Sequence, residues 1–177
     1  MNTKNKNRPI TPKMEDYLEA IVALEKEKKA VRVKDIASKM GVSMPTVTSM
    51  LKNLSKIDLV EYEKYEYIEL TEKGREIGKE IQRRHRALKK FLHEILGIDA
   101  IVAESEACKM EHAVSTPTLD RFVDFMNFIK SCPRAGSKWI GYFHEYLKHG
   151  KSKATCEKYR QYLDDIYNKI RSEIGRE

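Results

Sequence analysis

The chain has 177 residues, of which 41% are hydrophobic and 34% are charged, a globular composition that excludes an intrinsically disordered chain, a solenoid and a large catalytic α/β fold. Its net charge of +7 favours a polyanionic partner, although such a surplus also occurs in proteins that merely stay soluble. No apolar run is long enough to cross a membrane, and the N-terminus lacks the apolar core of a signal peptide, so we expect a cytoplasmic protein with no membrane partner.

The first predicted helix follows a polar, aperiodic arm over residues 1–10. Thr11 is a good N-cap, and Pro12 suits the first helical position because its missing N–H would have no partner there. The apolar side chains of this helix recur at helical spacing: Met14, Leu18 and Ile21. Asp16 and Glu19 therefore fall on the opposite side of the helix.

A helix-turn-helix is predicted next. Residues 33–40 form its first helix, Gly41 can take the positive φ of a tight turn, and Ser43 can cap the second helix. The inward-facing stripe of the second helix is Val47, Leu51 and Leu54.

Two short strand-like runs, 60–64 and 67–70, then predict a β-hairpin. Thr71 can cap the helix that follows. Together with the helix-turn-helix, this hairpin predicts a winged helix-turn-helix DNA-binding domain over residues 1–73.

Residues 74–131 are predicted to form an all-helical domain. Its long first helix closes at Gly97, a second helix covers 100–114, and a third begins at Thr116. The third helix is apolar nearly all round, through Leu119, Phe122, Val123, Phe125, Met126, Phe128 and Ile129. Such a helix needs two partners, so we expect it to pack against its own domain and against a second copy in a homodimer.

Residues 132–177 are predicted to be a helical C-terminal extension with aromatic stripes at helical spacing. The fold class is thus mostly α, with a winged helix-turn-helix, an all-helical domain and a helical extension. Three cysteines, Cys108, Cys132 and Cys156, are an odd number in a reducing compartment, which favours ligands or free thiols over disulfides. Cys132 lies in a run like one zinc knuckle, which cannot close a tetrahedral site alone.

Cys108, Glu111 and His112 stand at positions i, i+3 and i+4. On a helix this spacing brings a thiolate, a carboxylate and an imidazole onto one face, a donor set that suits a first-row divalent ion. From spacing alone, a half-buried cysteine beside a surface Glu-His pair is the commoner arrangement. A metal hydrolase would use the same group around an activated water, but the chain has no His-Glu-x-x-His helix, and we expect no enzyme.

Four separated segments resemble the diphtheria toxin repressor family, including its manganese transport regulator branch. In chain order they are 14–19, like the family's first helix; 43–48, like the start of its recognition helix; 84–86, in its linking helix; and 106–112, in its metal helix. Each segment is weak alone, but four in the right order around a winged helix form a specific signal. The resemblance covers roughly residues 11–130 and implies a repressor of metal-ion homeostasis, activated by Mn²⁺ or Fe²⁺.

The resemblance also implies which residues bind the metal. The implied ligands are Asp16, Glu19, His85, Cys108, Glu111 and His112. Asp16 is typical of the manganese branch, whereas Cys108 is typical of the iron-responsive branch and replaces a glutamate that links two metals in the manganese branch. Lys89 and Glu104 replace two ligands of an ancillary site in the iron branch, and an ammonium repels a metal ion. The sequence is therefore a hybrid of the two branches.

The predicted recognition helix presents five candidate DNA contacts: Ser43, Pro45, Thr46, Ser49 and Lys52. Hydroxyls can bond base edges or phosphates, and proline and threonine carbons can touch thymine methyl groups. A homodimer would read a near-palindromic double-stranded operator with half-sites about 34 Å apart. The alternative is a metal-independent winged-helix regulator that senses an organic ligand between the aromatic helices of the extension.

Overall fold

The computed structural model describes residues 9–63, 67–131, 136–150 and 153–174. The chain divides into two compact units, Met1–Arg86 with Cys108–Ala113, and Ala87–Ala107 with Val114–Glu177. The predicted mostly helical fold class is confirmed. None of the helices in these ranges is long and apolar enough to cross a membrane. Residues 64–66 of the predicted hairpin and the run at Cys132 lie outside the described residues.

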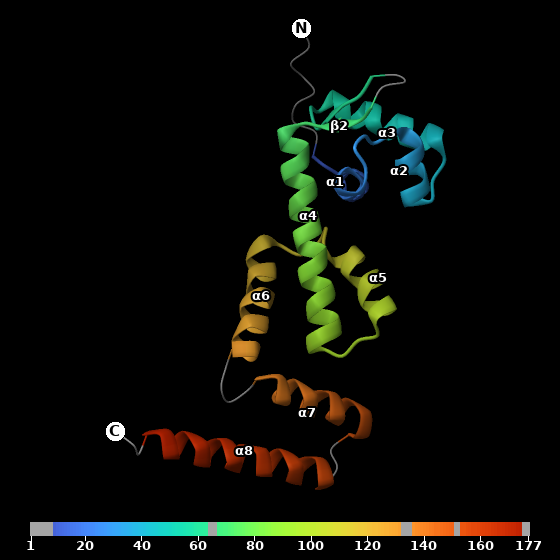
Figure 1. The fold of residues 1–177 in the computed structure, drawn as a ribbon. Helices are drawn as coiled ribbons and strands as arrows, with labels where there is room; N and C mark the ends of the chain where they lie inside the picture. The colour runs from blue at the N-terminus through green and yellow to red at the C-terminus, as the bar shows by residue number, and fades with distance from the viewer. Residues whose placement is uncertain (1–8, 64–66, 132–135, 151–152, 175–177) are drawn as a thin grey trace. The chain divides into compact units, whose positions relative to one another are not determined.

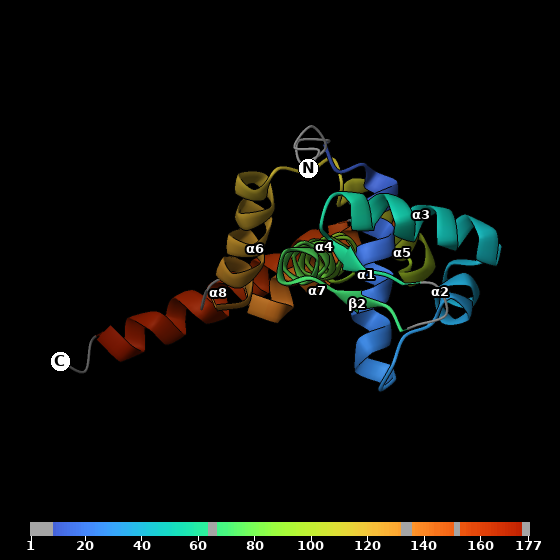
Figure 2. The same ribbon diagram turned by 90° about the horizontal axis from the view of Figure 1, so that it is seen from above.

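The first unit holds the helix-turn-helix and its hairpin (Figure 1). Its elements are α1 (Pro12–Glu27), α2 (Val33–Met40), α3 (Met44–Lys56), β1 (Val60–Glu61), β2 (Glu69–Leu70) and most of α4 (Glu72–Lys90). Helix α2 contacts both α1 and α3, while β1 lies against α3 and β2 against α1. Figure 2 shows β2 beside α1 from above. The core of this unit therefore forms where these three helices and the hairpin meet.

The predicted caps of the first unit are confirmed. Thr11 Oγ1 accepts a hydrogen bond from the N–H of Met14 at 3.3 Å, and Ser43 Oγ accepts one from the N–H of Thr46 at 3.4 Å. Gly41 has φ of 66°, the left-handed conformation that glycine adopts without a steric cost. The inward stripe of α3 is fully buried: Val47, Leu51 and Leu54.

The hairpin is shorter than the two predicted strand-like runs. Its antiparallel register pairs Val60 with Leu70 and Glu61 with Glu69. Ile68 also bridges to Val31, whose carbonyl accepts from the N–H of Ile68 at 2.9 Å. The segment before α2 thus joins the hairpin to the helical core.

Two glycines bring α4 very close to its neighbours in the first unit. A Cβ at Gly78 would lie 2.8 Å from the carbonyl oxygen of Leu18 in α1, and a Cβ at Gly74 would collide with the carbonyl of Leu59. Since both obstacles are backbone atoms, they cannot swing away. Glycine at these positions lets α4 lie directly on α1 and on the end of the helix-turn-helix.

The second unit contains the π-helical segment η2 (Phe91–Ile95), most of α5 (Ala100–Met110), α6 (Thr116–Ser131), α7 (Gly136–His149) and α8 (Lys153–Ile174). Its core joins Ile95, Met126 and Ile129, against which Trp139 of α7 packs. Helices α7 and α8 form an antiparallel pair (Figure 1), in which Tyr142 packs against the rings of Tyr159 and Tyr162. The predicted helical extension is confirmed.

Two helix ends bear on the predictions, and only the second differs: the long helix closes at Gly97, whose φ is 69°, as predicted. The long helix finishes in a π-helical turn, where the N–H of Leu96 reaches the carbonyl of Phe91 at 3.1 Å, rather than in a regular α-turn. The helix predicted over 100–114 ends at Met110, because the N–H of Ala113 bonds the Met110 carbonyl three residues back and closes a tight turn. Glu111 and His112 therefore lie in a turn rather than on α5.

Candidate metal centre

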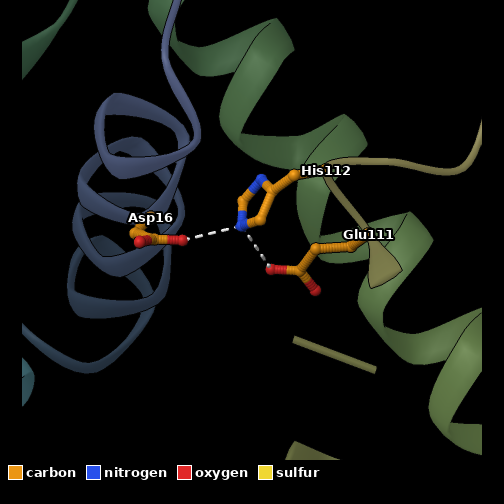
Figure 3. Close-up of side chains that lie close together, drawn as sticks. All are labelled: Asp16, Glu111 and His112. Carbon is orange, nitrogen blue, oxygen red and sulfur yellow. Dashed lines mark ion pairs between the residues drawn. The ribbon is translucent and has the colours of Figure 1, made fainter. Parts of the chain in front are cut away.

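Three side chains from distant parts of the sequence converge within the first unit (Figure 3). Asp16 comes from the start of α1, and Glu111 and His112 come from the turn after α5. Nε2 of His112 lies 2.8 Å from Oδ1 of Asp16 and 3.5 Å from Oε1 of Glu111. One ligand atom from each residue lies within 4.8 Å of the other two. An imidazole nitrogen and two carboxylate oxygens thus face one point.

The carboxylate of Glu111 is fully buried. Its Oε2 lies 2.7 Å from Nδ1 of His85, but its Oε1 has no hydrogen-bond partner among the described residues. Burying a carboxylate oxygen without a partner is costly, and a cation at this point would remove that cost. Carboxylate and imidazole donors suit Mn²⁺ and Fe²⁺. The residues present therefore fit a divalent transition metal.

The electrostatics of this region also favour a cation. Burial, and then the charge of Glu111, raise the pKa of Glu19, while His85 partly offsets the effect. Burial lowers the pKa of His112, but its hydrogen bond to Glu15 and the charge of Asp16 outweigh burial and raise it overall. The charge of Glu111 acting on Glu19, and a histidine that favours its charged form, both indicate negative potential at this point, which a divalent ion would neutralise.

The other three predicted ligands differ in how close they lie to this group. His85, in α4, reaches the group through its contact with Glu111. Glu19 is half-buried and interacts electrostatically with Glu111, but it lies outside the three-residue group. Cys108 is exposed on α5 and also lies outside that group. The expectation of a single helical face carrying Cys108, Glu111 and His112 is wrong, because α5 ends at Met110.

One residue near the group was missed from the sequence. Oε2 of Glu15 lies 2.6 Å from Nδ1 of His112, although the two residues are 97 positions apart. In sequence, Glu15 looks like an ordinary acid of a first helical turn, favoured there by the helix dipole. The contact depends on how α1 packs against the turn after α5, so no local pattern could have revealed it.

The two residues that replace ancillary ligands in the resemblance contact each other in the second unit. Nζ of Lys89 lies 2.6 Å from Oε2 of Glu104. A lysine ammonium is a hydrogen-bond donor without a lone pair for a metal. The Lys89 side chain therefore offers a metal ion no donor atom.

The five candidate DNA contacts share one exposed side of α3 or its N-terminal cap: Ser43, Pro45, Thr46, Ser49 and Lys52. Oγ of Ser43 lies 2.8 Å from Oγ1 of Thr46, so these hydroxyls are held together at the start of the helix. The opposite side of α3 is buried in the core, so this side of the helix faces solvent, together with Met44 at its first position.

Comparisons with known proteins agree with these features. Residues 9–68 match the iron dependent repressor N-terminal DNA binding domain, and residues 71–140 match the iron dependent repressor metal binding and dimerisation domain. The chain is 40% identical over 122 residues to an uncharacterised HTH-type transcriptional regulator of Methanocaldococcus jannaschii, a match covering 68% of this chain and 98% of that protein. It is 39% identical over 120 residues to the HTH-type transcriptional regulator MntR of Bacillus subtilis strain 168, covering 68% of this chain and 84% of that protein.

A solved structure is also similar. The manganese regulator SloR superimposes with a TM-score of 0.60 at 38% identity, over 70% of this chain and 58% of that chain. The match therefore spans less than two thirds of SloR. Of the residues that converge here, Asp16 lies in the region matched by the DNA-binding domain, and Glu111 and His112 lie in the region matched by the metal-binding domain. The chain belongs to the iron-dependent repressor family, which is the diphtheria toxin repressor family indicated by its sequence.

Proposed function

We propose that this protein is a dimeric transcriptional repressor of metal-ion homeostasis, activated by Mn²⁺ or Fe²⁺. The observation that carries the proposal is the convergence of Asp16, Glu111 and His112 within 4.8 Å. An ion held there would connect α1, which packs against α2 of the helix-turn-helix, with the turn that leads into α6.

Activation follows from linkage between metal binding and DNA binding. A ligand shifts an equilibrium only by its differential affinity for two states, so the metal must bind the DNA-competent arrangement more tightly. The proposed ligands are the three convergent residues and His85, together with Glu19 and Cys108. When bound, the metal supplies a positive charge that holds α1 to the turn after α5.

The proposed DNA contacts are the five exposed residues of α3 and its cap, inserted in the major groove of a near-palindromic operator. Dimerisation through α6 is supported by two large apolar residues on its surface: Phe125 is 44% exposed and Phe128 is 63% exposed. Exposed apolar side chains of this size are typical of an interface. Two recognition helices would then be about 34 Å apart, one turn of DNA. A protein with this function acts by binding in the cytoplasm and needs no catalytic residue.

Cys108 is proposed to set the preference between the two metals. A thiolate is a softer donor than a carboxylate, and the natural affinity order already places Fe²⁺ above Mn²⁺. Replacement of Cys108 by glutamate should therefore move activation toward Mn²⁺. An unchanged ratio of the activating concentrations would mean that Cys108 is not a ligand.

The proposed function can be tested with a duplex selected from random DNA in the presence of Mn²⁺. Fluorescence anisotropy under anaerobic conditions would follow binding to that duplex and to a scrambled one, with Mn²⁺, with Fe²⁺ and with a chelator. Either ion should activate the wild type, whereas His112→Ala and Glu111→Ala should retain only weak, salt-sensitive attraction to both duplexes. Equal affinity for the selected duplex with metal and with chelator, and no bound metal by elemental analysis, would favour the metal-independent regulator instead.

A further inference from the structure

We infer that Glu15 is a positioning residue of the metal centre, which holds the His112 ring so that Nε2 is the nitrogen offered to the metal. This role rests on the proposed function. Glu15 would not itself bind the ion. It would act through the ring that it contacts.

The two nitrogens of His112 face different groups. Nδ1 lies 2.6 Å from Oε2 of Glu15, whereas Nε2 faces Asp16 at 2.8 Å and Glu111 at 3.5 Å. An ionised carboxylate can only accept a hydrogen bond, so a charged His112 ring donates from both nitrogens, to Glu15 and to Asp16. The contact with Glu15 is the shorter of the two, and the Glu15 side chain is less exposed than that of Asp16, at 21% against 38%. When the ring is neutral, Glu15 therefore keeps the proton on Nδ1 and leaves the lone pair of Nε2 for a metal.

Helix α1 holds the ring at both nitrogens because Glu15 and Asp16 are neighbours in its first turns. The side chains of His112 and Glu15 are 11% and 21% exposed, so water screens their contact only partly. A carboxylate on the far nitrogen of a metal-binding histidine fixes the tautomer and the ring orientation and makes the ring a better donor. Glu15 is the carboxylate on the far nitrogen, Nδ1, of His112.

His85 provides a contrast within the same cluster. Its Nδ1 faces Oε2 of Glu111, a carboxylate that belongs to the convergent group. The carboxylate facing Nδ1 of His112 comes from a residue outside that group. Glu15 can therefore be changed without removing any of the three converging ligand atoms.

The test compares Glu15→Ala and Glu15→Gln with a matched control, Glu25→Gln. Glu25 also lies on α1, its side chain is 20% exposed, and it forms an ion pair with Arg75 away from the metal centre. The Mn²⁺ dissociation constant would be measured by competition with a fluorescent chelator. We expect Glu15→Ala to bind Mn²⁺ about tenfold more weakly, Glu15→Gln to lose less because its amide oxygen still accepts from Nδ1, and Glu25→Gln to match the wild type.

A second readout reports the tautomer directly. Long-range ¹H–¹⁵N correlation spectra of the metal-free protein, at alkaline pH where the ring is neutral, should show His112 protonated on Nδ1 in the wild type and in Glu25→Gln. In Glu15→Ala the proton should be found largely on Nε2. If Glu15→Ala merely unfolded the protein, the whole spectrum would change. A changed tautomer of His112 in an otherwise native spectrum therefore reports the lost contact with Glu15.

Wild-type Mn²⁺ affinity and an unchanged His112 tautomer in Glu15→Ala would overturn the inference. So would a loss in Glu15→Gln as severe as in Asp16→Asn, because Glu15 would then be a ligand. A wild type that binds neither Mn²⁺ nor Fe²⁺ would instead refute the proposed function, and the spectra would still show whether Glu15 fixes the ring.

Discussion

The helix-turn-helix core and the C-terminal helix pair have equally regular apolar stripes but very different burial. The stripe of α3 is fully buried beneath α2 and β1, whereas in α8 Leu163 is 42% and Tyr167 is 65% exposed. Among the described side chains of α7 and α8, Tyr162 alone is buried. A helical period predicts a helix, but the depth of burial depends on how many partners close over its stripe. We therefore expect mutations in the two regions to differ in cost.

The largest contrast should come from two helical glycines. Gly74→Ala should cost more than about 4 kcal/mol, because its Cβ would collide with the backbone of Leu59, and neither α4 nor the segment between α3 and β1 can retreat without opening the core. Gly141→Ala in α7 should stabilise by about 0.5 to 1 kcal/mol, since its Cβ would meet nothing within 4 Å. Urea unfolding followed by far-UV circular dichroism would measure both, and equal effects would remove the contrast.

Deletion of one leucine side chain should follow the same division. Leu51→Ala should lower the free energy of unfolding by about 3 kcal/mol, because Leu51 is fully buried. Leu163→Ala should cost less than about 1 kcal/mol because that residue is already 42% exposed. Hydrogen exchange of peptides from α3 would measure the effect of Leu51→Ala. The fluorescence of Trp139, the single tryptophan, would follow unfolding of the second unit in Leu163→Ala. A larger loss at Leu163 would show that another surface covers α8 in solution.

Metal should sharpen the comparison by stabilising one region only. At a free Mn²⁺ concentration one hundred times the dissociation constant, the first unit should gain about 2.7 kcal/mol. Exchange protection should rise in α1 and in the turn at Glu111 and His112 and fall again after a chelator is added. Peptides from α7 and α8 serve as the internal control. Protection that rose equally in those helices would contradict a site confined to the first unit.

Acid should weaken the helix-turn-helix region through Asp35. The hydrogen bond from Lys28, and then that from the N–H of Arg32 at 2.9 Å, lower the pKa of Asp35 despite its burial. Its contribution is therefore present above the ordinary aspartate pKa of 3.8 and is lost as the pH falls through the lower folded-state value. Asp35→Ala should cost about 1 kcal/mol at neutral pH. Urea titrations at falling pH should show the difference from wild type vanishing in acid.

The elements that local chemistry specifies were predictable from the sequence. The cap at Ser43, the turn at Gly41 and the stripe through Leu51 each depend on residues close in the chain, and all are confirmed. The errors lie where a non-local or subtle backbone choice decides. The described hairpin pairs only Val60 with Leu70 and Glu61 with Glu69, and the helix predicted to reach residue 114 ends at Met110.

The candidate site shows the same limit. Spacing and resemblance indicated Glu111 and His112, and the resemblance added Asp16, so the convergent group was foreseen by residue. Its geometry was not, because the helix that was to present it stops at Met110. Glu15 was missed because its role depends entirely on tertiary packing.

The separation of Glu15 from His112 by 97 positions also orders events during synthesis. The core around Leu51 uses residues up to Leu70, so a nascent chain can complete it before residue 111 has been translated, as N-terminal domains commonly do. At that stage α3 has been made, but His112 and Glu111, which would bind the metal, have not. Newly made protein can thus acquire its helix-turn-helix fold before the residues of the proposed metal centre are complete.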